Sequence, residues 1–132
     1  MRRSELREHI FKVIFDVSFN ESEDMKEHMD LYFEQLENAS SEDLKYIQDK
    51  SEKIIEKIPE IDELLNKKTK GWKTTRMNKV DLCILRLAVY EMKWDEDVPV
   101  GVAIDEAVEL AKAYSGEGAP SFVNGVLAKM IQ

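Results

Sequence analysis

Two basic segments carry the side chains best suited to binding chemistry. In the first, Arg2, Arg3 and Arg7 fall within two turns of a predicted helix, and Lys12 follows about one turn further on. Guanidinium groups bind phosphates and base edges, and the free N–H groups at a helix start also favour anions. These residues could therefore form an RNA-binding site on a solvated first turn, which the spacing alone does not decide. A purely solvated basic run is the alternative.

The second basic segment, residues 67–79, contains six basic residues, no acidic residue and a Gly71-Trp72 pair. A basic segment with an aromatic side chain could bind RNA. Cations at the end of a helix also complement its dipole, and Gly71-Trp72 could form a packed turn. Both interpretations stay open from the sequence.

The residues that usually support catalysis or metal binding lack the required pattern. Cys83 lies in a strongly apolar stretch, which favours a buried, inert thiol. His9 and His28 each follow a Glu directly and lack the spacing of a helical metal site. We find no Gly-rich phosphate loop and no dinucleotide fingerprint. We therefore expect a protein that is not an enzyme and holds neither a metal nor a cofactor.

The composition indicates the number of domains, the fold class and the cellular compartment of the protein that carries these segments. The 132 residues correspond to one ordinary domain, and 43% hydrophobic residues supply a core. Five Gly and three Pro are too few for a many-stranded β domain, so the composition predicts an all-α fold. A single Cys fits a reducing compartment, and no apolar run has the length of a signal or a membrane span. We expect a cytoplasmic protein without membrane segments.

The charge is distributed in blocks. The net charge of −8 taken alone argues against nucleic acid binding, but residues 67–94 carry eight basic and two acidic groups. Residues 21–66 carry five basic and fifteen acidic groups. Because salt screens each surface charge beyond about 10 Å, a basic segment can still bind a phosphate chain locally. The acidic faces could bind basic partners.

Apolar stripes at helical spacing predict about seven helices joined by short loops. Capping boxes at Asn20–Glu23 and Asn78–Asp81 and a cap at Ser40 or Ser41 mark three of the starts. The predicted helices span about 4–17, 25–36, 41–58, a short stretch from Pro59, 80–90, 99–114 and 121–131. We expect the helix over 80–90 to be central and the last helix to turn Phe122, Val126, Leu127 and Met130 inward. The prediction is one domain with an N-terminal helical sub-bundle (1–66), a basic connector (67–77) and a C-terminal sub-bundle (78–132).

Four stretches together resemble the NusB family of bacterial transcription antitermination factors. They are Lys-Gly-Trp at 70–72, Val-Asp-Leu-Cys-Ile-Leu-Arg-Leu-Ala-Val-Tyr-Glu at 80–91, the run over 98–112, and Phe-Val-Asn-Gly-Val-Leu at 122–127. The order and spacing of these four stretches, taken together, are specific to this family, whereas any one stretch alone would be weak evidence. The resemblance implies an all-α protein of two packed, perpendicular sub-bundles. It also implies binding of single-stranded boxA-type RNA together with the ribosomal protein NusE, within an RNA polymerase antitermination complex that acts notably on rRNA operons.

The resemblance also implies roles for individual residues. Arg2, Arg3 and Arg7 match an Arg-rich helix start that meets RNA, and Phe122 matches an aromatic that lies toward RNA. Asp81 matches an acidic residue that faces NusE. Read without the resemblance, Phe122 could be a core residue and Asp81 half of a helix cap.

Two further interpretations concern charge and function. Arg86 stands in an otherwise apolar helix and should pair with an internal carboxylate such as Glu106. As alternatives to an antitermination factor, the chain could be the RNA-binding module of an RNA methyltransferase, or a helical adaptor that binds only proteins. The sequence leaves a homodimer open.

Overall fold

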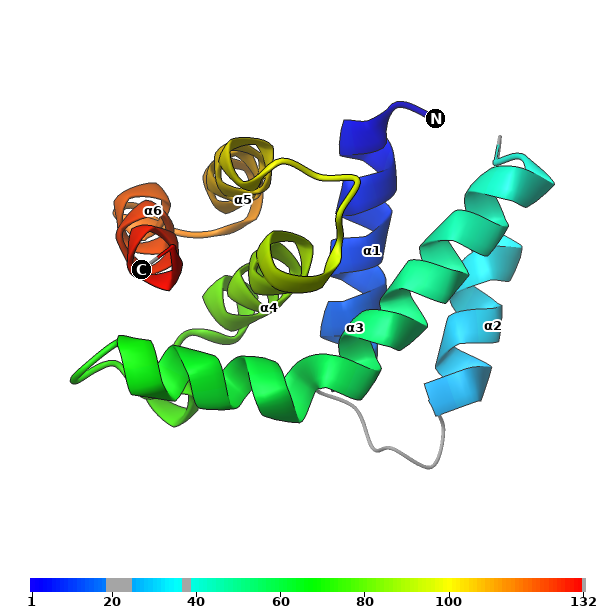
Figure 1. Ribbon diagram of the computed structural model, residues 1–132. Helices are drawn as coiled ribbons and strands as arrows, with labels where there is room; N and C mark the ends of the chain where they lie inside the picture. The colour runs from blue at the N-terminus through cyan, green and yellow to red at the C-terminus, as the bar shows by residue number, and fades with distance from the viewer. Residues whose placement is uncertain (19–24, 37–38, 132) are drawn as a thin grey trace. The chain divides into compact units, whose positions relative to one another are not determined.

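The computed structural model describes residues 1–18, 25–36 and 39–131, which form an all-helical protein (Figure 1). Within these ranges there are six α-helices, one short 3-10 helix and no strand. Their bounds are α1 Arg3–Ser18, α2 Met25–Gln35, α3 Ser41–Lys68, η2 Thr74–Arg76, α4 Lys79–Trp94, α5 Val100–Tyr114 and α6 Ala119–Met130. The predicted all-α fold class is confirmed.

The chain divides into two compact units, unit 1 (Met1–Glu56) and unit 2 (Lys57–Gln132). Unit 1 contains α1, α2 and the first part of α3, and unit 2 contains the rest, so the boundary falls inside α3. The sequence-based division into 1–66, 67–77 and 78–132 stays a prediction about the organisation of the chain.

In unit 1, α1 packs against α2 through the apolar face that the sequence predicts. The apolar side chains that α1 buries are Ile10, Phe11, Val13, Ile14 and Val17. Met29 of α2 is also buried. The predicted capping box at Asn20–Glu23 lies outside the described residues.

Two of the predicted helix caps are observed. The hydroxyl of Ser40 accepts a hydrogen bond from the backbone N–H of Asp43 at 3.1 Å, which identifies Ser40 as the cap of α3. The side-chain oxygen of Asn78 accepts from Val80 and Asp81 at the start of α4, at 2.8 and 3.4 Å. Both caps satisfy backbone donors that have no partner inside their helices.

The predicted helices over 41–58 and from Pro59 are one continuous helix, α3, so the prediction of a helix start at Pro59 is wrong. Ile47, Ile54 and Ile61 recur every seven residues and are all fully buried. This stripe continues past Pro59, which is exposed and lies inside the helix. Proline removes one backbone hydrogen bond, but the packing of the stripe holds the helix together on both sides.

In unit 2, α4 packs against both α5 and α6, which also pack against each other (Figure 1). Residues 82–91 of α4 are all buried, as predicted for a central helix. Cys83 is fully buried, which confirms the expected burial of its thiol. None of the helices in the described ranges combines the length and apolar content that crossing a bilayer requires.

The last helix, α6, starts at Ala119, two residues before its predicted start. Pro120 fits the first turn of a helix, where its missing N–H costs nothing. Gly118 takes the preceding position with a φ of +87°, a conformation that glycine adopts without strain. Val123 is fully buried, whereas Phe122 is only half-buried, so the prediction that Phe122 turns fully inward is wrong.

Candidate functional site

The N-terminal basic site lies in unit 1, at the start of α1. Arg2 and Arg3 are exposed, and neither guanidinium group has a hydrogen-bond or ion-pair partner among the described residues. Their guanidinium groups are therefore available to bind an anion such as a phosphate.

Arg7 differs from its two neighbours, and the expectation that it lies on a solvated turn is wrong. Only 6% of its surface is exposed, and it makes an interaction within the protein. Arg7 lies three residues before Ile10 and seven before Ile14, so it shares the face of α1 that is buried. Its contribution to RNA binding stays a prediction.

Lys12 lies further along α1 and is paired. Its Nζ is 3.7 Å from a carboxylate oxygen of Glu8, and both side chains are 42% exposed. A pair of this kind contributes little to stability and can be broken by a competing anion. Lys12 therefore remains a candidate for RNA binding, weaker than Arg2 and Arg3.

His9 makes a contact that the sequence did not predict. Its Nδ1 lies 2.6 Å from the hydroxyl oxygen of Tyr32 on α2, and the two rings meet edge to face. Burial lowers the pKa of the His9 imidazole from its usual 6.5, and the charge of Lys12 lowers it further. The contact with Tyr32 joins α1 to α2, and the lowered pKa favours the neutral form of His9. The side chain of His28 lies outside the described residues.

In unit 2, Phe122 and Asp81 line the same cavity, which has a volume of about 420 Å³. Trp72, Arg76 and the loop over 115–118 also line it. The structure therefore brings together the aromatic predicted to meet RNA and the carboxylate predicted to face a protein partner. The arginines of α1 belong to the other unit.

Trp72 packs against Phe122 in an edge-to-face pair, with ring centroids 5.1 Å apart and an interplanar angle of 64°. Trp72 is 52% exposed. Fifty residues separate the two rings in the sequence, so no local pattern indicates this pair. Together they form an accessible aromatic surface at the edge of the cavity.

Asp81 is held at the cavity by a neighbouring helix end. The hydroxyl of Ser115, just after α5, donates a short hydrogen bond to Oδ1 of Asp81. The backbone N–H of Asp81 donates to the side chain of Asn78, which is one half of the predicted capping box. The reciprocal bond from the Asn78 N–H to the Asp81 carboxylate is not found among the described residues. Oδ2 of Asp81 has no partner among the residues the structure describes. It can therefore accept a bond from a basic partner.

The basic segment over 67–79 contains the packed turn that the sequence allowed. Gly71 has a φ of +89°, and the N–H of Trp72 donates to the carbonyl of Thr69 at 3.0 Å. The hydroxyl of Thr69 lies 2.8 Å from the carbonyl oxygen of Trp72. The N–H of Thr74 donates to the side chain of Asn66 at 2.8 Å. The segment is thus tied to the end of α3.

The cations of this segment differ in their surroundings. Lys67 and Lys68 lie in the last turn of α3, where positive charge complements the helix dipole. Lys70, Lys73 and Arg76 are exposed, and the charged groups of their side chains have no hydrogen-bond or ion-pair partner in the described part of the chain. Helix-end stabilisation therefore accounts for only part of the segment's charge.

Arg86 pairs with an internal carboxylate, as predicted, and the pair that the structure describes is with Asp62; a pair with the suggested Glu106 stays a prediction. Its Nε and Nη2 donate to the two oxygens of Asp62 at 2.9 and 2.7 Å. Asp62 lies on α3, which the sequence could not place beside α4. The buried charge is thus satisfied inside unit 2.

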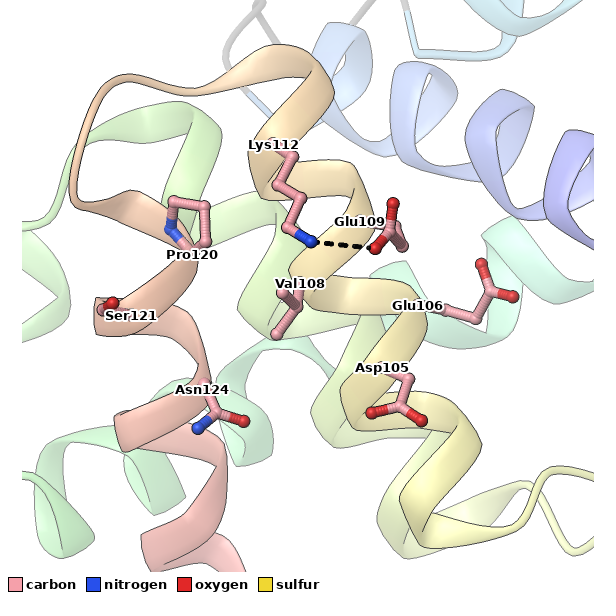
Figure 2. A pocket seen from close by; sticks show the side chains of 8 residues that line it. All are labelled: Asp105, Glu106, Val108, Glu109, Lys112, Pro120, Ser121 and Asn124. Carbon is pink, nitrogen blue, oxygen red and sulfur yellow. Dashed lines mark hydrogen bonds and ion pairs between the residues drawn. The ribbon is translucent and has the colours of Figure 1, made fainter.

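A second, open hollow of about 550 Å³ lies between α5 and α6 (Figure 2). Asp105, Glu106 and Glu109 line it from α5, and Asn124 lines it from α6. Lys112 is bound to Glu109 at 3.2 Å. Within the described residues, no three His, Cys, Asp or Glu side chains are arranged to hold a metal ion. The absence of a metal or cofactor stays a prediction.

Comparison with known proteins identifies the class. The chain is an all-helical protein of the NusB fold: a structure of T. maritima NusB matches 98% of it and 90% of that chain, with 32% identity and a TM-score of 0.87. The NusB family matches residues 4–132. The chain belongs to the NusB family.

Two further matches describe relatives with a named role. The chain is 50% identical to the transcription antitermination protein NusB of Agathobacter rectalis, over 98% of each chain. It also matches a crystal structure of the antitermination factors NusB and NusE in complex with dsRNA, with 27% identity, a TM-score of 0.75, and 96% of this chain and 92% of that chain covered.

Proposed function

We propose that this chain is an RNA-binding transcription antitermination factor that binds boxA RNA together with NusE. In this role it joins the RNA polymerase antitermination complex and favours transcription past terminators, notably on rRNA operons. The observation that carries the proposal is the 50% identity, over nearly the full length of both chains, to a transcription antitermination protein. That relationship favours this function over an RNA methyltransferase module or an adaptor that binds only proteins.

The described side chains suit this function. The exposed guanidinium groups of Arg2 and Arg3 can neutralise phosphates, and the half-exposed ring of Phe122 can stack on a base. The free oxygen of Asp81 can bind a basic group of NusE, since ribosomal proteins are typically basic. The matched structure of NusB and NusE, which contains dsRNA, supports NusE and RNA as partners.

The protein acts by binding rather than by catalysis in this proposal. It holds RNA and NusE in one complex, so that the affinity for each partner depends on the other. Because the RNA is nascent and bacterial, we place the protein in the cytoplasm.

Read-through of a terminator tests the function directly. A template with a boxA element upstream of a terminator is transcribed in the presence of NusE and the other complex components, with and without this chain. We expect the chain to raise read-through, and a template with a scrambled boxA to show no rise. Equal read-through with and without the chain on the boxA template would contradict the proposal.

A further inference from the structure

We propose that the turn after α3 forms a second RNA-contacting surface, made up of Lys70, Trp72, Lys73, Arg76 and Phe122. On this Trp72 surface, the two aromatic rings hold an unpaired base and the three cations bind the flanking phosphates. The inference rests on the proposed RNA-binding function and adds a contact surface to it.

The exposure of Trp72 is the first observation. A tryptophan is usually well buried, because its large apolar ring gains much from leaving water. Trp72 keeps 52% of its surface in solvent and meets Phe122 in a T-shaped contact. Such a contact leaves much of the indole free, and an exposed aromatic ring is a stacking platform for an unpaired base.

The turn presents this ring in a fixed position. Gly71 adopts a left-handed conformation, and Thr69 binds both the N–H and the carbonyl of Trp72. The contact with Phe122 then anchors the side chain to α6. Because the turn is already ordered, little conformational entropy has to be lost when a base binds.

The cations of the surface carry uncompensated charge. Three lysines of the described helices pair with a glutamate three or four residues away, at 3.2 to 3.7 Å: Lys12–Glu8, Lys57–Glu60 and Lys112–Glu109. Other exposed lysines, such as Lys45, Lys53 and Lys129, have no such pair among the described residues, but none of them lies in the turn that carries the exposed ring of Trp72. Lys70, Lys73 and Arg76 have no such partner among the described residues. In a chain with a net charge of −8, three adjacent unpaired cations favour an anionic ligand.

The cavity beside the Trp72 ring is lined by both a cation and carboxylates. Arg76, Trp72 and Phe122 line it together with Asp81 and Glu117. Asp81 is held by Ser115 and is the proposed contact for NusE. The exposed carboxylate of Glu117 repels phosphate, but it can accept a hydrogen bond from the amino group of a base. The arrangement therefore favours a base inside the cavity and phosphates at Arg76 and the lysines of the turn.

These features select single-stranded RNA as the ligand. In a duplex the bases are stacked on each other and their faces are closed to a protein aromatic. An unpaired base can turn out of its strand and reach Trp72, while the chain continues over the cations.

Fluorescence of Trp72 tests the stacking contact. The chain has two tryptophans, and replacement of the other one (Trp94→Phe) leaves Trp72 as the only indole. The single-Trp protein is titrated with single-stranded boxA-type RNA, with the same RNA annealed to its complement, and with heparin. We expect quenching by the single strand that saturates with binding, and little change with the duplex or with heparin, which has no bases. Quenching by heparin equal to that by RNA would contradict base stacking.

Affinity measurements test the same surface independently. We expect Trp72→Ala to weaken binding of the single strand by about tenfold and Trp72→Phe to retain most of the affinity. The triple change Lys70→Ala/Lys73→Ala/Arg76→Ala should reduce the slope of log affinity against log salt by about two units. Its matched control, Lys45→Ala/Lys53→Ala/Lys129→Ala, removes the same charge from exposed positions elsewhere and should leave the slope unchanged.

The outcomes separate this inference from the proposed function. If the parent protein binds RNA but neither Trp72 fluorescence nor the salt slope of the triple variant changes, the inference is wrong and the proposed function stands. Equal losses in the triple variant and its control would also overturn it, because the effect would then be one of net charge. If the parent binds no RNA even with NusE, both fail.

Discussion

Arg86 and Asp62 form a bidentate ion pair that joins α4 to α3, with Nε–Oδ1 and Nη2–Oδ2 distances of 2.9 and 2.7 Å. The guanidinium is the more buried member, since Arg86 lies within the stretch of α4 over 82–91 that is buried throughout. We expect Asp62→Ala to lower the free energy of unfolding by about 2 to 3 kcal/mol, because it leaves a buried charge without its partner. Urea denaturation measures the change.

Two variants control for this effect. Asp62→Asn keeps the size and one acceptor oxygen, so it should cost less than Asp62→Ala. The double variant Asp62→Ala/Arg86→Met removes the buried charge as well, so its loss should be smaller than the sum of the single losses. An Asp62→Ala protein as stable as the parent would show that the pair is not structurally important.

Asp81→Lys should weaken NusE binding, because it replaces the accepting carboxylate with a charge that repels a basic partner. It also removes the hydrogen bond from Ser115, at a cost of about 1 kcal/mol of stability. Ser115→Ala is the matched control, since it removes that bond and keeps the carboxylate. We expect it to melt at a lower temperature but to bind NusE as the parent does. A folded Asp81→Lys protein with parental NusE affinity would place the interface elsewhere.

The three N-terminal arginines should differ in their effect on folding. Arg7→Ala is expected to cost about 1 to 2 kcal/mol of stability, because Arg7 packs its side chain on the buried face of α1. Arg2→Ala/Arg3→Ala should stay within about 0.5 kcal/mol of the parent, since both side chains lie in solvent. Chemical denaturation of the two variants checks this, and equal losses would be inconsistent with the observed burial.

The stability of unit 1 should depend on pH through His9. Its pKa is lowered in the folded chain, so between that value and the ordinary 6.5 the unfolded chain binds more protons. The His9 contribution is therefore complete above about pH 6.5 and is lost as the pH falls through this window. Asp43 has a lowered pKa through its hydrogen bond from the terminal ammonium, and its contribution is lost only in more acidic solution.

Unfolding free energies measured from pH 7.5 to 5 test this prediction in the parent and in His9→Gln. The parent should lose more stability than the variant as the pH falls. Identical pH profiles would mean that His9 does not titrate differently in the folded state.

Local pattern was sufficient to locate most helices. The stripe around Ile10 and Ile14 predicted a helix over 4–17, and the structure has a helix over Arg3–Ser18. Apolar residues at this spacing lie on one face, and can be buried together, only when the segment is helical. At Pro59 the local rule failed, since continuous packing of α3 outweighs one lost backbone hydrogen bond. The position of Arg7, on the same helix face as Ile10, indicated that it would be buried. We nevertheless predicted exposure, because arginine is usually found at the surface.

The candidate site was only partly predictable. Resemblance to a family, rather than spacing, singled out Phe122 and Asp81, and the structure places both at one cavity. The sequence indicated that Arg86 needs a carboxylate, but which one depends on how α3 meets α4. The contact between Trp72 and Phe122 likewise depends on tertiary packing, so the local sequence pattern could not predict it.

Binding of boxA RNA over a range of salt concentrations, with and without NusE, tests the central claim most directly. We predict that the parent binds the RNA, that NusE tightens binding, and that affinity falls as salt rises. In Arg2→Ala/Arg3→Ala the slope should be smaller by about 1.4 units, because two phosphate contacts are lost at roughly 0.7 each. A parent protein that retains boxA RNA no better than a scrambled sequence, even with NusE present, would contradict the account.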